Sequence, residues 1–269
     1  MKKKIIDKTE LQKILESHEN WLNDVGLDIG GKGRRADLSN TDLHGVCLTK
    51  VNLQHAILRG ADLRNASLEE ANLQEVVLEN ANLRGANLKN ANLREADLTY
   101  SDMKDADISN ANLRDAFLGN AILSEANLQN ANLRDTSMYK TCLRNANLNN
   151  ANLKYADMSL ANLMGAKIKN TEFLGANLYG VYLPNGMFQI TFYGSVNRYI
   201  TYDSINDNII CYIADKNYSG HLSSFKEHVK VIYGEKGKTP NIVLYEEYMA
   251  AVKFFKKVRE AERSTNIQE

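Results

Sequence analysis

The sequence has few of the residues that interrupt, cross-link or anchor a polypeptide chain. Its 269 residues include only two prolines and three cysteines, and its 33 basic side chains are balanced by 33 acidic ones. Three cysteines in a chain of this length give no disulfide framework. No stretch approaches the roughly 18 uninterrupted apolar residues of a membrane span. The composition therefore predicts a soluble, globular protein that does not enter a membrane.

The balance of charge disfavours two classes of function. A nucleic-acid binder usually carries a basic excess that neutralises phosphates, and a protein mimic of nucleic acid needs a comparable acidic excess. The chain as a whole has neither. Its N-terminal segment, MKKKIIDKTE, is basic but lacks the apolar region of a secretion signal. We therefore expect a cytoplasmic protein that does not bind nucleic acid directly.

A period of five residues organises the middle of the chain. Residues 36–185 divide into 30 consecutive pentapeptides of the form A-(N/D)-L-x-x, and every central residue is large and apolar: 24 Leu, 3 Met, 2 Ile and 1 Phe. The position two residues before each centre is Ala in 21 of them. A period of five fits neither an α-helix nor a flat strand. It indicates a coil whose corners recur at every fifth residue.

This pattern, with stretches such as ANLRGANLKNANLREADL at 81–98, resembles the pentapeptide-repeat family. The resemblance implies a mainly β fold, the right-handed quadrilateral parallel β-helix, in which four pentapeptides form one coil. The central residue and the small residue then point inward, and the other three positions point outward. Thirty pentapeptides give about 7.5 coils, a rod of ~36 Å at ~4.8 Å per coil.

Asparagines recur along one predicted face of this rod. They occupy Asn52, Asn72, Asn92, Asn112, Asn132 and Asn152. A spacing of 20 residues places them directly above one another, so we expect their amides to form a hydrogen-bonded ladder along the axis.

The segment before the repeat, residues 1–35, predicts a helical cap. Apolar residues recur at helical spacing over 9–24, with Thr9 as the expected N-cap. The open end of a β-helix exposes unpaired backbone groups, so a cap is required there. Glycines at 26, 30, 31 and 33 then indicate a flexible connection to the first coil.

The segment after the repeat, residues 186–269, predicts a small α+β domain. Strands are expected at 188–194, 198–203 and 208–214, and helices at 221–234 and 241–262. This order of elements resembles a C-terminal tail found on pentapeptide-repeat proteins of bacteria and their phages. The resemblance implies no activity for the tail.

The sequence offers no constellation for catalysis or metal binding. Cys47 and Cys142 fall on adjacent faces of the rod, too far apart along its axis for a disulfide. His221 and His228 lack the spacing of four that a helical zinc pair needs. The hypothesis of an enzyme stays open only for the C-terminal segment, around Tyr202, Asp203, Cys211 and His228. We therefore expect no enzyme activity, no metal and no cofactor.

Counting in twenties assigns every outward residue to one of four faces. Of the 90 outward positions, 12 carry a large apolar side chain, and seven of these lie on the face centred on Leu38, Leu58 and Leu78, which holds 24 positions. An apolar stripe on a protein surface normally marks a contact. We therefore predict a non-catalytic interaction or scaffold protein. Its expected partner-binding residues are Ile57, Val77, Tyr100, Phe117 and Tyr139.

The sequence does not decide which of three surfaces covers this stripe. The predicted helix at 241–262 spans ~33 Å at 1.5 Å per residue, about the length of the rod, so it could fold back along the stripe. A second copy of the chain, forming a homodimer, could cover it instead, as could a foreign protein from the host of a phage or bacterium.

The resemblance also implies an alternative function. Some members of the family resemble B-form DNA in size and charge, and they bind or protect type II topoisomerases such as gyrase. Here residues 36–185 contain 17 acids and 14 bases, and the four faces carry −2, −1, +1 and −1. The bases at 94, 114 and 134 stand beside the acids at 95, 115 and 135, so we expect a self-neutralising ladder. A strong negative field is therefore not expected.

Overall fold

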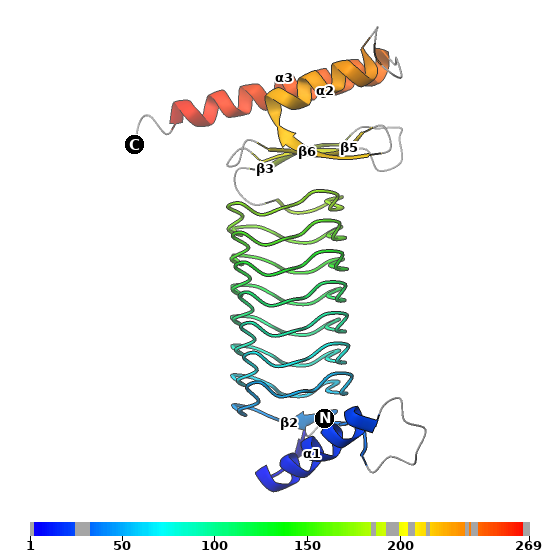
Figure 1. Ribbon diagram of the computed structural model, residues 1–269. Helices are drawn as coiled ribbons and strands as arrows, with labels where there is room; N and C mark the ends of the chain where they lie inside the picture. The colour runs from blue at the N-terminus through cyan, green and yellow to red at the C-terminus, as the bar shows by residue number, and fades with distance from the viewer. Residues whose placement is uncertain are drawn as a thin grey trace. The chain divides into compact units, whose positions relative to one another are not determined.

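The computed structural model describes residues 3–24, 33–183, 187–191, 199–203, 208–213, 216–234, 237 and 242–265. The chain divides into two compact units. The N-terminal unit comprises residues 1–172 and 176–182, and the C-terminal unit comprises residues 173–175 and 183–269. The first contains the repeat and the second contains the α+β elements (Figure 1). The predicted boundary at 185/186 lies outside the described residues.

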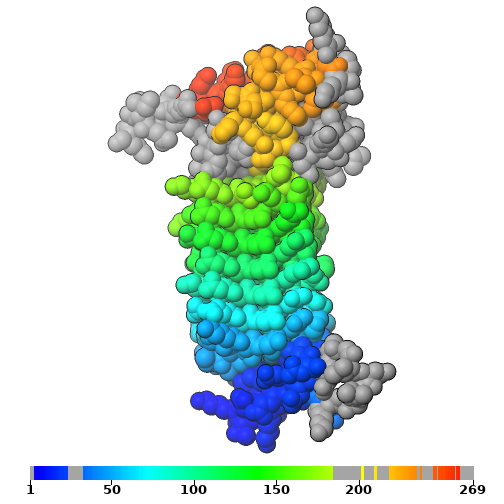
Figure 2. Space-filling view, viewed as in Figure 1, coloured from blue at the N-terminus to red at the C-terminus, as the bar shows by residue number. Residues whose placement is uncertain are grey.

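The repeat folds into a coil with a period of 20 residues. The residue before each central residue forms a parallel β-bridge with the residue 20 positions later, which occupies the same place on the next coil. These bridges run from Asp37 with Ile57 to Asn162 with Tyr182. Backbone hydrogen bonds accompany the bridges, as where the Leu58 amide donates to the Val77 carbonyl over 2.7 Å. Each side of a coil is short, so its pairing consists of single bridges rather than long strands. The coils stack as the quadrilateral β-helix requires, and their outward side chains lie in register (Figure 2).

The interior of the coil is filled by the central and small residues. Every central residue from Leu53 to Leu163 is at most 1% exposed. Burial of this apolar surface at ~25 cal/mol per Å² is the main force that holds the stack together. Polar residues at the small position satisfy their hydroxyls on carbonyl groups, as Thr136 does on Leu133 over 2.7 Å and Thr141 on Leu118 over 2.8 Å.

The corners of the coil require a left-handed backbone at the last residue of most pentapeptides. Non-glycine residues there have φ between 53° and 64°. Asparagine and glycine adopt this conformation readily, which explains why they are common at that position. Tyr100, Tyr155 and Leu160 also adopt it, with φ of 58°, 61° and 58°. Bulky side chains are unfavourable in this region, so these three positions carry a local energetic cost.

The N-terminal segment adds one strand and one helix to the first coil (Figure 1). Strand β1 (Lys4–Ile5) pairs in parallel with β2 (Thr41–Asp42), a pairing that the sequence did not predict. Helix α1 (Lys8–Asp24) begins one residue before the predicted start. The prediction of Thr9 as its N-cap is wrong, because the carboxylate of Asp7 accepts the Glu10 amide over 2.7 Å.

Helix α1 is fixed to the first coil by buried contacts. Leu11 is 9% exposed and His18 is fully buried, and the His18 Nδ1 accepts the amide of Ala36 over 3.1 Å. Gly33 lies directly on the helix, since a β-carbon there would overlap the backbone nitrogen of Trp21. Gly33 is therefore a packing residue rather than a flexible connection. The other predicted connecting glycines, at 26, 30 and 31, lie outside the described residues.

The C-terminal unit contains a four-stranded antiparallel sheet in the order β3-β4-β5-β6, followed by two helices. Its elements are β3 (Met187–Thr191), β4 (Tyr199–Asp203), β5 (Asn208–Ile213), β6 (Lys216–His221), α2 (Leu222–Tyr233) and α3 (Ile242–Thr265). Strand β6 was not predicted, because its sequence KNYSGH contains a single large apolar residue. It pairs along its whole length with β5 through the backbone, from Lys216 opposite Ile213 to His221 opposite Asn208.

The apolar face of α3 packs inside this unit. Tyr248, Val252 and Phe255 are at most 3% exposed, and they form one core with residues of α2, β4 and β5. Tyr245 and Met249 pack against the same core. The idea that α3 covers the stripe of the rod with its apolar face is therefore wrong, because that face is already occupied.

Candidate protein-binding face

The predicted partner-binding residues lie on one side of the coil, here called the apolar face. It comprises the outward residues of the pentapeptides centred on Leu38, Leu58, Leu78, Leu98, Leu118, Met138, Met158 and Leu178. Tyr100, Phe117 and Tyr139 on this face are 60%, 52% and 40% exposed. Ile57 and Val77 are half-buried. Tyr179 on the same face is 46% exposed, so the face presents four large aromatic side chains to solvent.

A groove on the apolar face joins two of these five residues. Val77 and Phe117 line it two coils apart, with Asp97 on the coil between them. Its volume is about 670 Å³. The remaining lining residues are Glu75, Val76, Glu95, Thr99 and Asp115. Ile57, Tyr100 and Tyr139 are on the same face but outside the groove.

The carboxylates around this groove were missed as site residues. Glu75, Glu95 and Asp115 belong to the neighbouring face, but they are the last residues of their pentapeptides and adjoin the corner. The second residue of the next pentapeptide, such as Asp97, adjoins the same corner from the other side. The signal was therefore present in the sequence, as acids on both sides of the corner. The site combines apolar and acidic groups rather than forming a purely apolar stripe.

The acids around the groove differ in how they are neutralised. Glu95 pairs with Arg94 over 2.8 Å, and Asp115 pairs with Arg114 over 3.3 Å and with Arg94 over 3.7 Å. Asp97 accepts only the amide and hydroxyl of Thr99, over 3.1 and 2.6 Å. No Lys or Arg within the described residues lies at ion-pair distance from Asp97. Its charge is therefore available to an incoming cation.

Elsewhere on the coil, charge and amide ladders follow the prediction. The alternation continues through Arg134 and Asp135, which are 2.9 Å apart, so the expected self-neutralising ladder is confirmed. Asparagine amides of successive coils bond to one another, as Asn112 does to Asn92 over 3.3 Å and Asn132 to Asn112 over 3.1 Å. The predicted asparagine ladder is confirmed as well. Both ladders lie on the face centred on Leu93, Leu113 and Leu133, where neighbouring polar groups bond to one another.

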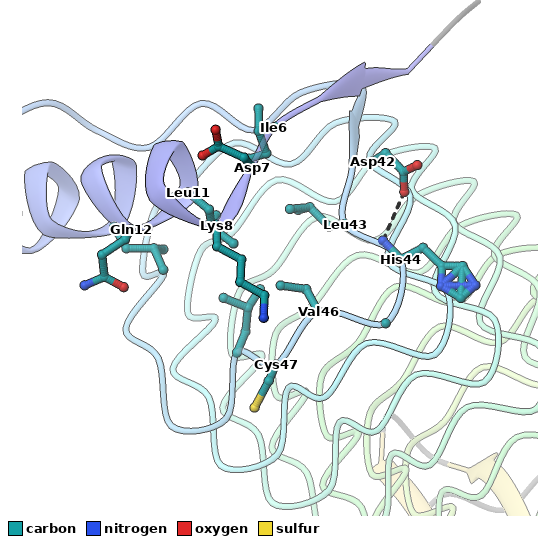
Figure 3. Close-up of a pocket in the computed structure, with 13 residues that line it drawn as sticks. Ile6, Asp7, Lys8, Leu11, Gln12, Asp42, Leu43, His44, Val46 and Cys47 are labelled. Atoms are coloured by element: carbon teal, nitrogen blue, oxygen red, sulfur yellow. Dashed lines mark hydrogen bonds between the residues drawn. The ribbon is translucent and has the colours of Figure 1, made fainter.

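A second hollow of about 570 Å³ lies between α1 and the first coil (Figure 3). Leu11, Leu43 and Val46 give it an apolar floor, and the exposed Cys47 lies at its side. Hydrogen bonds from the Thr49 amide and hydroxyl lower the pKa of the Cys47 thiol. Within the described ranges, no three metal-ligating side chains come together.

Of the four residues that left an enzyme function open, the structure describes the side chains of Tyr202 and His228. Tyr202 is fully buried and packs on Phe255, with ring centroids 5.0 Å apart. The half-buried His228 packs against Tyr218 at 4.8 Å. The side chains of Asp203 and Cys211 lie outside the described residues. None of the helices over the described ranges has the length and apolarity needed to cross a membrane.

Comparison with known proteins identifies the repeat. The profile of the family "Pentapeptide repeats" matches 8 copies, over residues 33–54, 47–85, 77–115, 111–150 and 146–183. Among curated proteins, no relative with significant sequence similarity was found.

Solved structures of other pentapeptide-repeat proteins are similar to the chain, and two of them are described here. One is HetL, a pentapeptide-repeat protein involved in heterocyst differentiation regulation from the cyanobacterium Nostoc sp. strain PCC 7120. It is 30% identical over 57% of this chain and 76% of its own, with a TM-score of 0.31. The other is trypsin-treated QnrB1, a plasmid-mediated fluoroquinolone resistance protein, which is 16% identical over 56% of this chain and 79% of its own, with a TM-score of 0.53. At that identity, QnrB1 shares the fold alone. The chain belongs to the pentapeptide-repeat family, whose members fold as right-handed quadrilateral β-helices.

Proposed function

We propose that this protein is a non-catalytic interaction protein of the cytoplasm, and that its apolar face binds another protein. The contact residues are Ile57, Val77, Tyr100, Phe117 and Tyr139. The observation that carries the proposal is the exposure of Tyr100, Phe117 and Tyr139 on one side of a coil whose other three sides each carry polar pairs between successive coils. Large apolar side chains gathered on one side of a protein mark an interaction site.

The chemistry of these side chains supports the proposal. Aromatic residues dominate the energetics of protein interfaces because they bury a large area with few rotatable bonds. Tyr100 is the most exposed of the three, and it occupies a left-handed corner where asparagine is more favourable. A contact between Tyr100 and a partner protein accounts for the presence of a bulky residue in this unfavourable conformation.

The remaining parts of the chain have structural roles in this proposal. Helix α1 and strand β1 form a cap that satisfies the first of about 7.5 coils, so the rod does not associate end to end. The proposed domains are the cap at 1–35, the rod at 36–185 and an assembly domain at 186–269. The resemblance of that last domain to tails of bacterial and phage proteins supports an origin in one of them.

The decisive variant replaces Val77, Tyr100 and Phe117 with Asp. If the apolar face binds protein, this triple variant loses self-association in light scattering, and it loses the partners that co-purify with the wild-type chain. Retention of both the wild-type mass and the wild-type partners would eliminate the proposal.

A matched control places the same three charges on a polar face. Asn90, Gln129 and Asn149 are outward residues of pentapeptides centred on Leu88, Leu128 and Leu148. Their replacement by Asp should leave mass and partners unchanged. If the control loses association too, the effect comes from added charge and not from the apolar face.

The alternative function is a DNA mimic that binds or protects gyrase. The similarity of the coil to the QnrB1 fold favours it. The charge distribution disfavours it, because nine of the rod's 14 Lys and Arg side chains pair with a carboxylate of the same rod. A supercoiling assay separates the two functions: a mimic inhibits gyrase or protects it from a quinolone, and an interaction rod of the kind proposed here does neither.

A further inference from the structure

We propose that the groove between Val77 and Phe117 binds helix α3 of a second copy of this chain. This inference rests on the proposed function and names its partner. The contact uses the exposed face of α3, where Phe254 lies between lysines. In the proposed contact, Phe254 packs against Phe117, and Lys257 meets the carboxylate of Asp97.

The groove requires a partner that is both apolar and basic. Its apolar lining includes Val77 and Phe117, and the latter is 52% exposed. Its rim contains four carboxylates, of which Asp97 has no basic partner within the described residues. The apolar face is also the most acidic of the four, with a net charge of −2 from Asp37, Glu79, Asp97 and Asp157 against Arg59 and Lys140. An apolar side chain flanked by cations is complementary to this surface.

The exposed face of α3 has that composition. Phe254 is 47% exposed, although it lies on the helix that supplies much of the core of the C-terminal unit. Lys253 and Lys257 are exposed on adjacent turns, and no carboxylate of the described residues pairs with them. Residues 248–259 contain four basic side chains and no acidic one. The helix thus carries a local basic patch centred on an aromatic residue.

The two surfaces agree in length. Ala250, Lys253, Phe254 and Lys257 follow the spacing i, i+3, i+4, i+7, so they form one strip that is ~10.5 Å long. The groove spans three successive coils, which is ~9.6 Å at ~4.8 Å per coil. Helices that bind in grooves use anchors at this spacing. One strip of α3 therefore matches the whole length of the groove.

A second copy accounts for this pairing because each chain carries both surfaces. The apolar face of α3 is buried in its own unit, so the Phe254 strip on the opposite side is free for an external contact. If each copy offers its α3 to the groove of the other, two identical contacts form around a two-fold axis. Together they bury twice the area of a single contact, which favours a stable dimer.

The test is a charge exchange between two full-length variants, Asp97→Lys and Lys257→Asp. Each variant alone faces a like charge in both contacts of its own dimer, so the dissociation constant of each dimer should rise roughly tenfold or more in sedimentation velocity. A mixture of the two is expected to recover the dimer, because the heterodimer contains one reversed pair and one native pair.

Each substituted residue has a matched control in the same chain. Asp157 occupies the same position of its pentapeptide as Asp97, on the same face of the coil. It accepts the Ser159 amide over 3.1 Å, just as Asp97 accepts the Thr99 amide, but it does not line the groove. Lys256 is exposed next to Lys257 on a different side of α3. Asp157→Lys and Lys256→Asp should keep the wild-type mass. Asp97→Asn retains the local hydrogen bonds without the charge, so it weakens the dimer even if Asp97→Lys misfolds.

The outcomes separate this inference from the proposed function. Recovery of the dimer in the mixture, with unaffected controls, supports it. A wild-type chain that stays monomeric overturns it, since no second copy then occupies the groove. A wild-type dimer that the Val77, Tyr100 and Phe117 variant disrupts, but that charge exchange does not restore, overturns the role of α3 while retaining the apolar face as an interface.

Discussion

The asparagine ladder should contribute measurably to the stability of the rod, and Asn112→Ala tests it. The Asn112 amide donates to Asn92 over 3.3 Å, and its oxygen accepts the Asn132 amide over 3.1 Å and the backbone amide of Arg114 over 3.3 Å. Removing Asn112 therefore deletes three hydrogen bonds. At a net ~0.5–1.5 kcal/mol each, and with the lower end favoured at a half-exposed site, the loss is about 1.5–3 kcal/mol.

Asn82→Ala provides the matched control. Asn82 occupies the same position of a pentapeptide on another face, and it accepts the backbone amide of Arg84 over 3.2 Å. It has no asparagine amide directly above or below it, because its neighbours in the column are Asp62 and Asp102. Its loss should cost about 0.5–1 kcal/mol.

The assay is urea unfolding of both variants, followed by circular dichroism. The difference between them isolates the two bonds of the ladder, and we expect Asn112→Ala to be less stable by about 1–2 kcal/mol. Equal midpoints for the two variants would refute the reasoning. The stacked asparagines would then contribute through their tolerance of the coil geometry, and the amide bonds between them would be energetically neutral.

Three further predictions concern the first coil and the interior. Burial lowers the pKa of His18 below 6.5, so the unfolded chain takes up a proton at a higher pH than the folded chain does. The attachment of α1 therefore weakens as the pH falls below 6.5. Trp21 fluorescence during unfolding measures this loss of stability, and an unfolding midpoint that does not change in acid would contradict it. Arg35 and His55 face the same ring and add to the effect. Leu113→Ala removes a fully buried side chain and should destabilise the rod by about 3–5 kcal/mol, whereas a loss under about 1 kcal/mol would mean that the coil collapses around the gap. Gly33→Ala should detach α1, seen as increased amide exchange in the helix, and wild-type exchange would show that the backbone there can shift.

The fold of the rod was predictable because its determinants are local. Each pentapeptide specifies one side of the coil, and an unbroken register of central residues from Leu38 to Leu183 leaves no ambiguity about which positions face inward. The ladder bonds followed from the same counting. Strands β1 and β6 were not predictable, since Lys4–Ile5 and Lys216–His221 have no apolar alternation and pair through the backbone alone.

The candidate site was predictable only in part. Counting in twenties placed Val77 and Phe117 on one face, but it treated the four faces as separate surfaces. The groove lies at a corner, where Glu95 of one face meets Asp97 of the next. The role of α3 was also missed, because a helical stripe in the sequence does not say which surface it packs against. Its apolar side forms the core of its own unit and leaves Phe254 exposed.

The most direct test of the central claim is hydroxyl-radical footprinting of the intact chain, free and associated. Tyr139 is 40% exposed on the apolar face, and Ile122 and Tyr155 on other faces are similarly exposed, at 42% and 43%. If the apolar face binds protein, labelling of Tyr100, Phe117 and Tyr139 falls on association, and labelling of Ile122 and Tyr155 stays the same. Unchanged labelling of the three aromatic residues, or protection of Ile122 and Tyr155 in their place, would contradict the assignment of this face as the binding surface.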